Sequence, residues 1–227
     1  MSFDDAISAL SKDALKFVKD RQVIGLGSGR AATAFVNSLG QYIKQKKLAV
    51  HAVPTSLQIK LVAEKSGIHI IDSGQIEKID IVFDGADQID AQGNLIKGGG
   101  GALLRENILI SSADKVVIMA DSTKFVKYFN RSVPVEVHPF ARSTVKKFIE
   151  KLGGRPELRA IDRGYPFITE NGNVIYDCDF GTIKTPKSLA HKIKQLPGVI
   201  EVGIFTRKPD VIYRAKENGK FDVLSNS

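Results

Sequence analysis

The stretch Val23-Ile-Gly-Leu-Gly-Ser-Gly-Arg30 decides the fold class of this chain. Its first four residues have the length and apolar character of a short strand, and the glycines at its end permit a tight turn. From about Ala31 to Leu39 the apolar residues return at helical spacing. A strand, a glycine turn and a helix in this order form the opening unit of an α/β sheet.

The same rhythm continues on both sides of this unit. Upstream, apolar residues from Phe3 to Phe17 repeat at steps of three and four, which predicts a helix with one buried face. Downstream we expect strand 48–53, helix 56–66, strand 68–71, strand 79–83, helix 102–111 and strand 116–120. This alternation predicts a mainly parallel, Rossmann-like sheet with helices on both faces.

The rhythm changes near Asn130. We expect strand 133–137, helix 143–152, strand 157–160, a strand over 167–178 broken at Asn171-Gly172, helix 187–195 and strand 199–205. This β-α-β-β-α-β order is the split arrangement of a ferredoxin-like α+β domain.

We expect a hairpin next, with strands 210–214 and 221–224 joined by Glu217-Asn-Gly219, in a position to return to the first sheet. We therefore predict a Rossmann-like catalytic domain over residues 1–130 and 206–227, and a smaller ferredoxin-like domain over 131–205.

Composition narrows the class of partner. The 227 residues carry a formal net charge of +8, with a pI near 9.5, which fits an anionic partner such as nucleic acid or a phosphorylated metabolite. No apolar run approaches the roughly 20 residues that a membrane span needs. The acidic start of the chain is unlike a signal peptide. We expect a soluble, cytoplasmic protein without a membrane partner.

Histidine and cysteine give no sign of a metal site. The four histidines are far apart and lack paired ligand spacing, and the single Cys178 lies in a strand-like stretch. We expect Cys178 to be a buried strand thiol rather than a nucleophile or ligand.

The first candidate functional segment is the glycine turn, Gly25-Leu-Gly-Ser-Gly-Arg30. Free backbone N–H groups and the helix dipole can hold a phosphate there. A dinucleotide site would need a third glycine where Arg30 stands, and an acid about 20 residues on; both are absent. A purely structural turn is the other alternative.

The second segment is Asp84-Gly-Ala-Asp87, which follows the expected strand 79–83. Open α/β sheets place ligands at the carboxyl ends of their strands, where two acids could exchange protons. The alternative is that Asp84 caps the strand exit and Asp87 begins a turn.

The third segment is Lys97-Gly-Gly-Gly-Gly101, followed by an expected helix that contains Glu106. Four successive glycines suggest exposed N–H groups or an unusual backbone path. A helical wheel places Glu106 in the apolar stripe of its helix, and burial of a carboxylate suits a general base near neutral pH. A buried salt bridge with Lys97 or Arg105 is the alternative. Lys97 could instead stabilise a developing oxyanion.

Together these segments resemble ribose-5-phosphate isomerase of the A type. The resemblance rests on their order and spacing, and on the further motifs Pro54-Thr-Ser56, Arg105-Glu106, Val135-Glu-Val137 and Leu152-Gly-Gly-Arg155. It extends from about Phe3 to the C-terminus.

The resemblance implies interconversion of ribose 5-phosphate and ribulose 5-phosphate through an enediol, without a metal or organic cofactor. Glu106 would carry a proton between carbon-1 and carbon-2, while Lys97 and the amides of Gly98, Gly99 and Gly100 would steady the enediolate. The segment Asp84-Gly85-Ala86-Asp87 would assist ring opening. Phosphate would be held by the loop of Ser28, Gly29, Arg30 and Ala31, and by Lys124. The resemblance also favours a homodimer or homotetramer.

The chain departs from the family pattern at three places. Where members commonly have Thr-Gly-Ser-Thr, this chain has Ser28-Gly-Arg-Ala31, so Arg30 either binds phosphate as a charged fork or points to solvent. The usual acid after Asp87 is Gln88, and the usual lysine after Glu106 is Asn107. Neither of the last two changes removes an expected proton carrier.

Two other classes of protein compete with the isomerase. A sugar-phosphate-sensing regulator would suit the basic charge, but the first α/β unit begins almost at Met1, and we expect no DNA-binding module before it and no nucleic-acid partner. Retention of Glu106 separates the two, since a sensor needs no proton carrier. A nicotinamide-dependent dehydrogenase would need the dinucleotide site.

Overall fold

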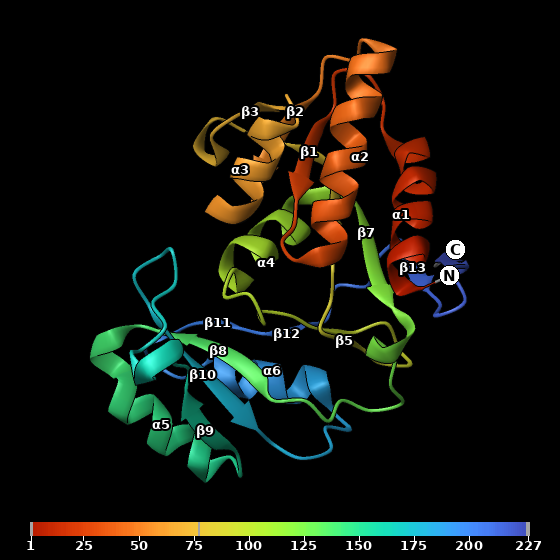
Figure 1. The fold of residues 1–227 in the computed structure, drawn as a ribbon. Coiled ribbons are helices and arrows are strands. Elements are labelled where there is room, and N and C mark those ends of the chain that lie inside the picture. The colour runs from red at the N-terminus through yellow and green to blue at the C-terminus, as the bar shows by residue number, and fades with distance from the viewer. Residues whose placement is uncertain (1, 77, 226–227) are drawn as a thin grey trace. The chain divides into compact units, whose positions relative to one another are not determined.

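The computed structural model describes residues 2–76 and 78–225, and the chain divides into two compact units (Figure 1). The first unit takes in Met1–Ala86, Arg105–Lys124 and Pro209–Ser227, and the second Asp87–Leu104 and Phe125–Lys208. Residues 87–104, 125–130 and 206–208, which the sequence analysis assigned to the first domain, thus pack with the second unit. Met1, Glu77, Asn226 and Ser227, also in the predicted first domain, lie outside the described residues.

The first unit is built on a mainly parallel seven-stranded sheet, as predicted. Only the edge pair runs antiparallel: the predicted hairpin forms and adds its first strand to this sheet. In spatial order the strands are β14 (Phe221–Ser225), β13 (Val211–Ala215), β7 (Ala113–Asp121), β4 (Ile79–Asp84), β1 (Val23–Leu26), β2 (His51–Pro54) and β3 (His69–Ile70).

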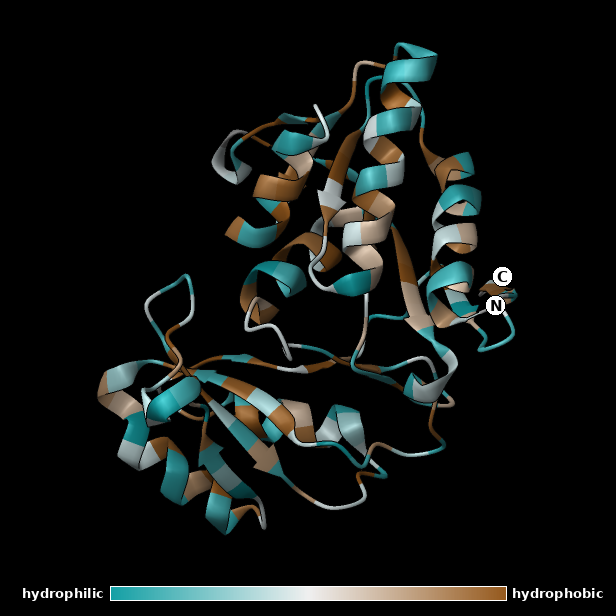
Figure 2. Cartoon of the chain, viewed as in Figure 1, coloured by the Kyte–Doolittle hydropathy of each residue, from teal (hydrophilic) through white to brown (hydrophobic). Residues whose placement is uncertain are grey.

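Helices cover both faces of this sheet. Helices α1 (Phe3–Ala14), α2 (Arg30–Lys46) and α3 (Leu57–Lys65) share a core with Ile24 and Leu26 of β1. Gly25, between those two residues, points to the other face, where a Cβ would lie 3.3 Å from Cδ1 of Leu109 in α4 (Leu103–Ser112). In Figure 2, α1 and α2 alternate between apolar and polar residues along their length.

Local sequence explains where the helices of this unit begin. Ser2 caps α1 through a capping box with Asp5, and the Ser56 side chain accepts a hydrogen bond from the Ile59 amide at the start of α3. Helix α2 lacks a side-chain cap, because Gly29 precedes it with φ of +89°. The turn before α2 is therefore a glycine conformation that leaves backbone N–H groups uncovered.

The second unit contains the predicted ferredoxin-like sheet. Its four strands are antiparallel in the order β11 (Val199–Val202), β8 (Val133–Val137), β10 (Val174–Asp179) and β9 (Arg155–Leu158). Helices α5 (Arg142–Lys151) and α6 (Pro186–Lys194) complete the β-α-β-β-α-β order and share its core. Cys178 is fully buried there, as predicted, and burial raises the pKa of its thiol.

Two predicted strands of this unit are wrong in part. The strand expected over 167–178 forms only from Val174, because Thr169 accepts a hydrogen bond from the Asn173 amide and donates one of 2.8 Å to the buried Glu136, making a polar turn. The strand expected over 199–205 is split at Gly203 into β11 and β12 (Ile204–Phe205). Strand β12 joins a small sheet with β6 (Leu95–Ile96) and β5 (Gln88–Ile89), which periodicity did not predict.

Short 3-10 turns link several of these elements. They are η1 (Leu15–Phe17), η2 (Ser73–Gln75), η3 (Ser122–Lys124), η4 (Pro139–Ala141) and η5 (Asp162–Gly164). Among the described residues, no helix is long and apolar enough to cross a membrane.

Candidate active site

Asp84 ends strand β4 in the interior of the first unit. Its side chain is fully buried, and its Oδ1 accepts a hydrogen bond of 2.7 Å from the amide of Gly85. The carboxyl group lies against Gly27, where an added Cβ would overlap the carboxylate and approach the Cβ of Asp84 to 2.5 Å. The glycine turn after β1 is therefore shaped to leave room for Asp84.

The same turn also reaches Glu106. Ser28 Oγ donates a hydrogen bond of 2.8 Å to Glu106 Oε1, joining the turn after β1 to the first turn of α4. Glu106 is 4% exposed, which confirms the burial that the helical wheel predicted. The sequence analysis gave Ser28 a place in the phosphate loop, but in this structure its hydroxyl holds the carboxylate.

The N-terminus of α2 follows directly. Helix α2 has 17 residues, and its first internal backbone bond runs from the Thr33 amide to Gly29 O. The preceding amides of Arg30, Ala31 and Ala32 point to the open end of the helix, where the dipole favours an anion. The predicted phosphate loop therefore presents main-chain amides at a helix N-terminus, and phosphate binding there stays a prediction.

Arg30 itself makes ion pairs within the first unit. Its Nη2 lies 3.3 Å from Asp121 Oδ2, and its Nη1 lies 3.6 Å from Asp4 Oδ1, with the side chain 60% exposed. Asp121 ends β7 and also accepts hydrogen bonds from the amide and hydroxyl of Thr123. Lys124 ends the next turn, η3, and is half-buried.

Ala86 ends the first segment of the first unit, and the other predicted residues, Asp87 and Lys97 to Gly100, belong to the second unit. Lys97 is 3% exposed, and its amide donates to Gly203 O at 3.0 Å. A Cβ on Gly203, which lies between β11 and β12, would overlap Lys97 O at 2.4 Å, so this close approach needs a glycine. The glycines that follow bend the chain through positive φ at Gly98, +104°, and at Gly101, +83°. The run of glycines therefore meets a backbone requirement.

Asp87 faces this loop. Its Oδ2 accepts a hydrogen bond of 2.8 Å from the amide of Gly99, and a Cβ on Gly99 would lie 2.7 Å from Oδ1. Asp87 is half-buried. The glycine loop thus holds a carboxylate with a backbone donor.

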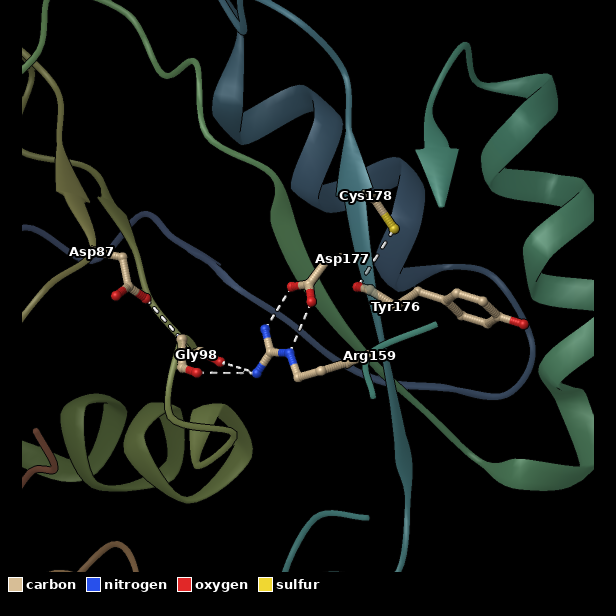
Figure 3. Close-up of polar contacts among 7 residues, drawn as sticks. Asp87, Gly98, Arg159, Tyr176, Asp177 and Cys178 are labelled. Carbon is tan, nitrogen blue, oxygen red and sulfur yellow. Dashed lines mark hydrogen bonds and ion pairs between the residues drawn. The ribbon is translucent and has the colours of Figure 1, made fainter. Parts of the chain in front are cut away.

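Sequence reasoning missed Arg159, which lies on the other side of the loop. Figure 3 shows its guanidinium between Asp177 and Gly98. It donates to the carbonyls of Gly98 and Gly99 and pairs with both oxygens of Asp177. No motif marks Arg159, because its partners in the loop lie about 60 positions earlier in the chain.

The two units thus contain different groups of the predicted site residues. The first contains two buried carboxylates and the N-terminus of α2, and the second contains a buried lysine, a half-buried carboxylate and the glycine loop. Residues 2–76 and 78–225 place no group of three or more His, Cys, Asp or Glu side chains where they could hold a metal ion.

Comparison with known proteins points to one family. The family model for ribose 5-phosphate isomerase A (phosphoriboisomerase A) matches residues 51–219. The chain is 42% identical to ribose-5-phosphate isomerase A of Haloarcula marismortui, over 95% of this chain and 94% of the relative. It is 44% identical to the protein of that name from Archaeoglobus fulgidus, with 87% and 89% covered.

Solved structures similar to this chain are also named ribose 5-phosphate isomerase. A ribose 5-phosphate isomerase A from Methanocaldococcus jannaschii superposes with a TM-score of 0.93 at 36% identity, covering 99% of this chain and 100% of the other. A D-ribose-5-phosphate isomerase solved in complex with phospho-erythronic acid superposes with a TM-score of 0.94 at 35% identity, with both chains fully covered.

Proposed function

The chain belongs to the ribose 5-phosphate isomerase A family and is an aldose–ketose isomerase, and from this premise we propose how its own residues act on ribose 5-phosphate. The observation that carries the proposal is the Glu106 carboxylate, which is buried and held by Ser28. A buried, oriented carboxylate is what a general base requires.

Glu106 removes the proton from carbon-2 of the open-chain aldose. The electrons of that C–H bond form the carbon-1 to carbon-2 double bond, and the carbonyl oxygen on carbon-1 takes up negative charge. A proton then passes from the hydroxyl on carbon-2 to the negatively charged oxygen on carbon-1. Glu106 returns its proton to carbon-1, which leaves a ketone at carbon-2 and a hydroxyl at carbon-1. Carbon-2 is oxidised and carbon-1 is reduced by the same electron pair, so the reaction needs no redox partner, and one carboxylate can serve both carbons.

The charge on the enediolate requires donors. We assign this role to Lys97 and to the amides of Gly98 and Gly100, because oriented donors stabilise developing oxyanions. The Gly99 amide, predicted for the same role, is bound to Asp87 Oδ2 at 2.8 Å and acts through that carboxylate. Asp84 and Asp87, with the intervening Gly85 and Ala86, contact the sugar hydroxyls and move protons during ring opening. The residues assigned to the two units are close in the chain. Only two residues separate Asp84 from Asp87, and helix α4 runs without interruption from the end of the glycine loop to Glu106.

The phosphate of the substrate binds at the N-terminus of α2. The loop from Ser28 through Gly29 and Arg30 to Ala31 offers backbone amides, and Lys124 offers a cation. Because Arg30 pairs with Asp121 and Asp4, its backbone amide rather than its guanidinium is the main contact. At positions 30 and 31, where family members commonly have hydroxyl side chains, we propose that this chain binds the phosphate chiefly through main-chain amides.

The phospho-erythronic acid named in the related structure fits this assignment. Its carboxylate resembles the enediolate oxygens in charge, and its phosphate resembles that of the substrate. We further propose that the enzyme acts without metal or organic cofactor, in the non-oxidative pentose phosphate pathway of the cytoplasm, as a homodimer or homotetramer.

Purified protein mixed with ribose 5-phosphate tests the proposal directly. Ketose formation should be measured with and without a chelator, and equal rates are expected. An inactive protein would contradict the isomerase assignment, and a rate that the chelator abolishes would contradict the metal-free mechanism. Light scattering during size-exclusion chromatography would show whether the protein is a dimer or tetramer; a monomer would contradict that part.

A further inference from the structure

Arg159 is a charged side chain that the reaction scheme above does not use. It follows strand β9 in the second unit, and its side chain is 14% exposed. Its Nε and Nη2 bind the two oxygens of Asp177 at 2.8 and 2.5 Å. This two-point contact fixes the plane of the guanidinium, since both groups are planar and bind in parallel.

The remaining nitrogen of Arg159 binds the glycine loop. Nη1 donates to Gly98 O at 2.8 Å and to Gly99 O at 3.2 Å (Figure 3). One nitrogen thus holds two successive carbonyls of a glycine segment, and the first of them also accepts a hydrogen bond of 3.0 Å from the Gly101 amide. The face of the guanidinium lies over Phe167, 5.8 Å from the ring centroid, and the Phe167 ring fills the space beside Gly101.

Fixing a carbonyl also fixes the amide on the other side of the same peptide. A trans peptide is planar, so its C=O and the next N–H point in opposite directions. The peptide that presents Gly98 O to Arg159 therefore presents the Gly99 amide away from it, and that amide binds Asp87 Oδ2 at 2.8 Å. In the next peptide, Gly99 O faces Arg159, so the Gly100 amide is directed away from the guanidinium in the same manner.

We propose that Arg159, clamped by Asp177, is a positioning residue that orients the Gly99 and Gly100 amides, the first toward Asp87 and the second toward the enediolate. The inference rests on the proposed roles of Asp87 and the glycine loop. Arg159 acts through the backbone and does not contact the substrate. Its positive charge also polarises both peptides, which strengthens their N–H groups as donors.

The second unit offers a matched control. Arg155 and Asp179 form an ion pair of 2.5 Å on the same two strands, in register with each other, but their side chains are 80% and 38% exposed. The hydrogen bonds of this pair join Arg155 to Asp179 and the Gly181 amide to Asp179 Oδ1, at 2.7 Å, rather than reaching the glycine loop as the clamp does. Arg155→Ala therefore removes an ion pair from β9 and β10 without freeing the loop.

The experiment compares Arg159→Ala, Arg159→Lys, Asp177→Asn and Arg155→Ala with the unmodified protein. For Arg159→Ala we expect kcat to fall about 100-fold, the loss expected when reacting groups are misplaced by about 1 Å, with KM changed less than about threefold. Inhibition by phospho-erythronic acid should weaken by at least about 10-fold, because its carboxylate needs the oriented amides. Inhibition by inorganic phosphate should be unchanged.

The other variants separate geometry from charge. Lysine at position 159 keeps the charge but lacks the fork, so kcat should recover only in part. Asp177→Asn should lower kcat in the same direction by about 10-fold, and Arg155→Ala should leave it within about twofold. If Arg159→Ala does not fold, Arg159→Lys and Asp177→Asn carry the test.

Two results would overturn the inference. One is a kcat equal to that of Arg155→Ala in folded Arg159→Ala or, if that variant does not fold, in Arg159→Lys and Asp177→Asn. The other is an equal loss of binding for inorganic phosphate and phospho-erythronic acid, which would mark a general disruption. Inactivity of the unmodified protein and of Arg155→Ala would instead show that the proposed function has failed.

Discussion

Asp84 and Asp87 are separated by two residues, and each carboxylate lies against a glycine, but the two are held differently. Asp84 is fully buried in the first unit, and Gly27 packs so near that an added Cβ would lie 2.5 Å from the Asp84 Cβ. Asp87 is half-buried in the second unit, and only its carboxylate end approaches Gly99. The first is fixed by packing, and the second by a backbone donor.

The two aspartates differ in how far each can move when a neighbouring side chain grows. A carboxylate end can rotate away from an intruding methyl group, whereas a Cβ is attached to the backbone and moves only with it. The first unit therefore presents a rigid acid, and the second an adjustable one whose position depends on the loop. The following substitutions should expose that contrast.

Gly27→Ala should have the largest effect among them. The new methyl group overlaps the Asp84 carboxyl and cannot be relieved by side-chain rotation, so β1 or β4 must shift. We expect the free energy of unfolding to fall by about 2–3 kcal/mol and turnover by at least about 100-fold. Chemical denaturation and steady-state kinetics measure both. Unchanged stability would show that the packing around Asp84 is looser than described.

Ser28→Ala should lower kcat by about 10-fold, since a hydrogen bond to a charged group contributes about 1.5–3 kcal/mol, not all of it expressed in the rate. The hydroxyl holds Glu106 Oε1, so its removal frees the base. Ser28→Thr is the control, because it keeps the hydroxyl, and it should retain most activity. A larger effect on KM than on kcat would assign Ser28 to the phosphate instead.

Gly99→Ala should be milder, with kcat lowered about fivefold and the free energy of unfolding changed by less than about 1 kcal/mol. The methyl group displaces only the Asp87 carboxylate. The same substitution in an Asp87→Asn background provides a double-mutant cycle. Strictly additive effects in that cycle would mean that Gly99→Ala does not act through Asp87.

Arg30→Ser should change KM by less than about threefold, because the exposed Arg30 side chain pairs with Asp121 and Asp4. Lys124→Ala is the comparison and should raise KM by about 10-fold through loss of a phosphate contact. A large rise in KM for Arg30→Ser would restore the guanidinium as a phosphate ligand.

Sequence patterns predicted most of the fold because its large elements are long and regular. The strand, turn and helix around Gly25, the parallel sheet and the hairpin at the C-terminal end all form as expected. The small sheet of β5, β6 and β12 was missed, because two-residue strands carry no periodicity and Ile96 pairs with Ile204 far along the chain. The false strand before Val174 failed because Thr169 uses side-chain hydrogen bonds to make a turn.

The sequence predicted which residues make up the candidate site, but not which of them contact one another. A helical wheel placed Glu106 in the core, since burial follows helix periodicity. It could not show that Ser28 binds Glu106 across 78 positions, or that Arg159 supports Gly98 across 61. Such pairs arise only when the sheet and the loops are folded.

Glu106→Gln tests the central claim, that Glu106 carries the proton, most directly. Glutamine keeps the size and a hydrogen-bond acceptor for Ser28 but cannot take up the proton. We predict that kcat for ribose 5-phosphate falls by about 10³-fold, while phospho-erythronic acid still binds within a few fold of the unmodified enzyme. Near-normal turnover of Glu106→Gln would contradict the account, because another group would then be the base.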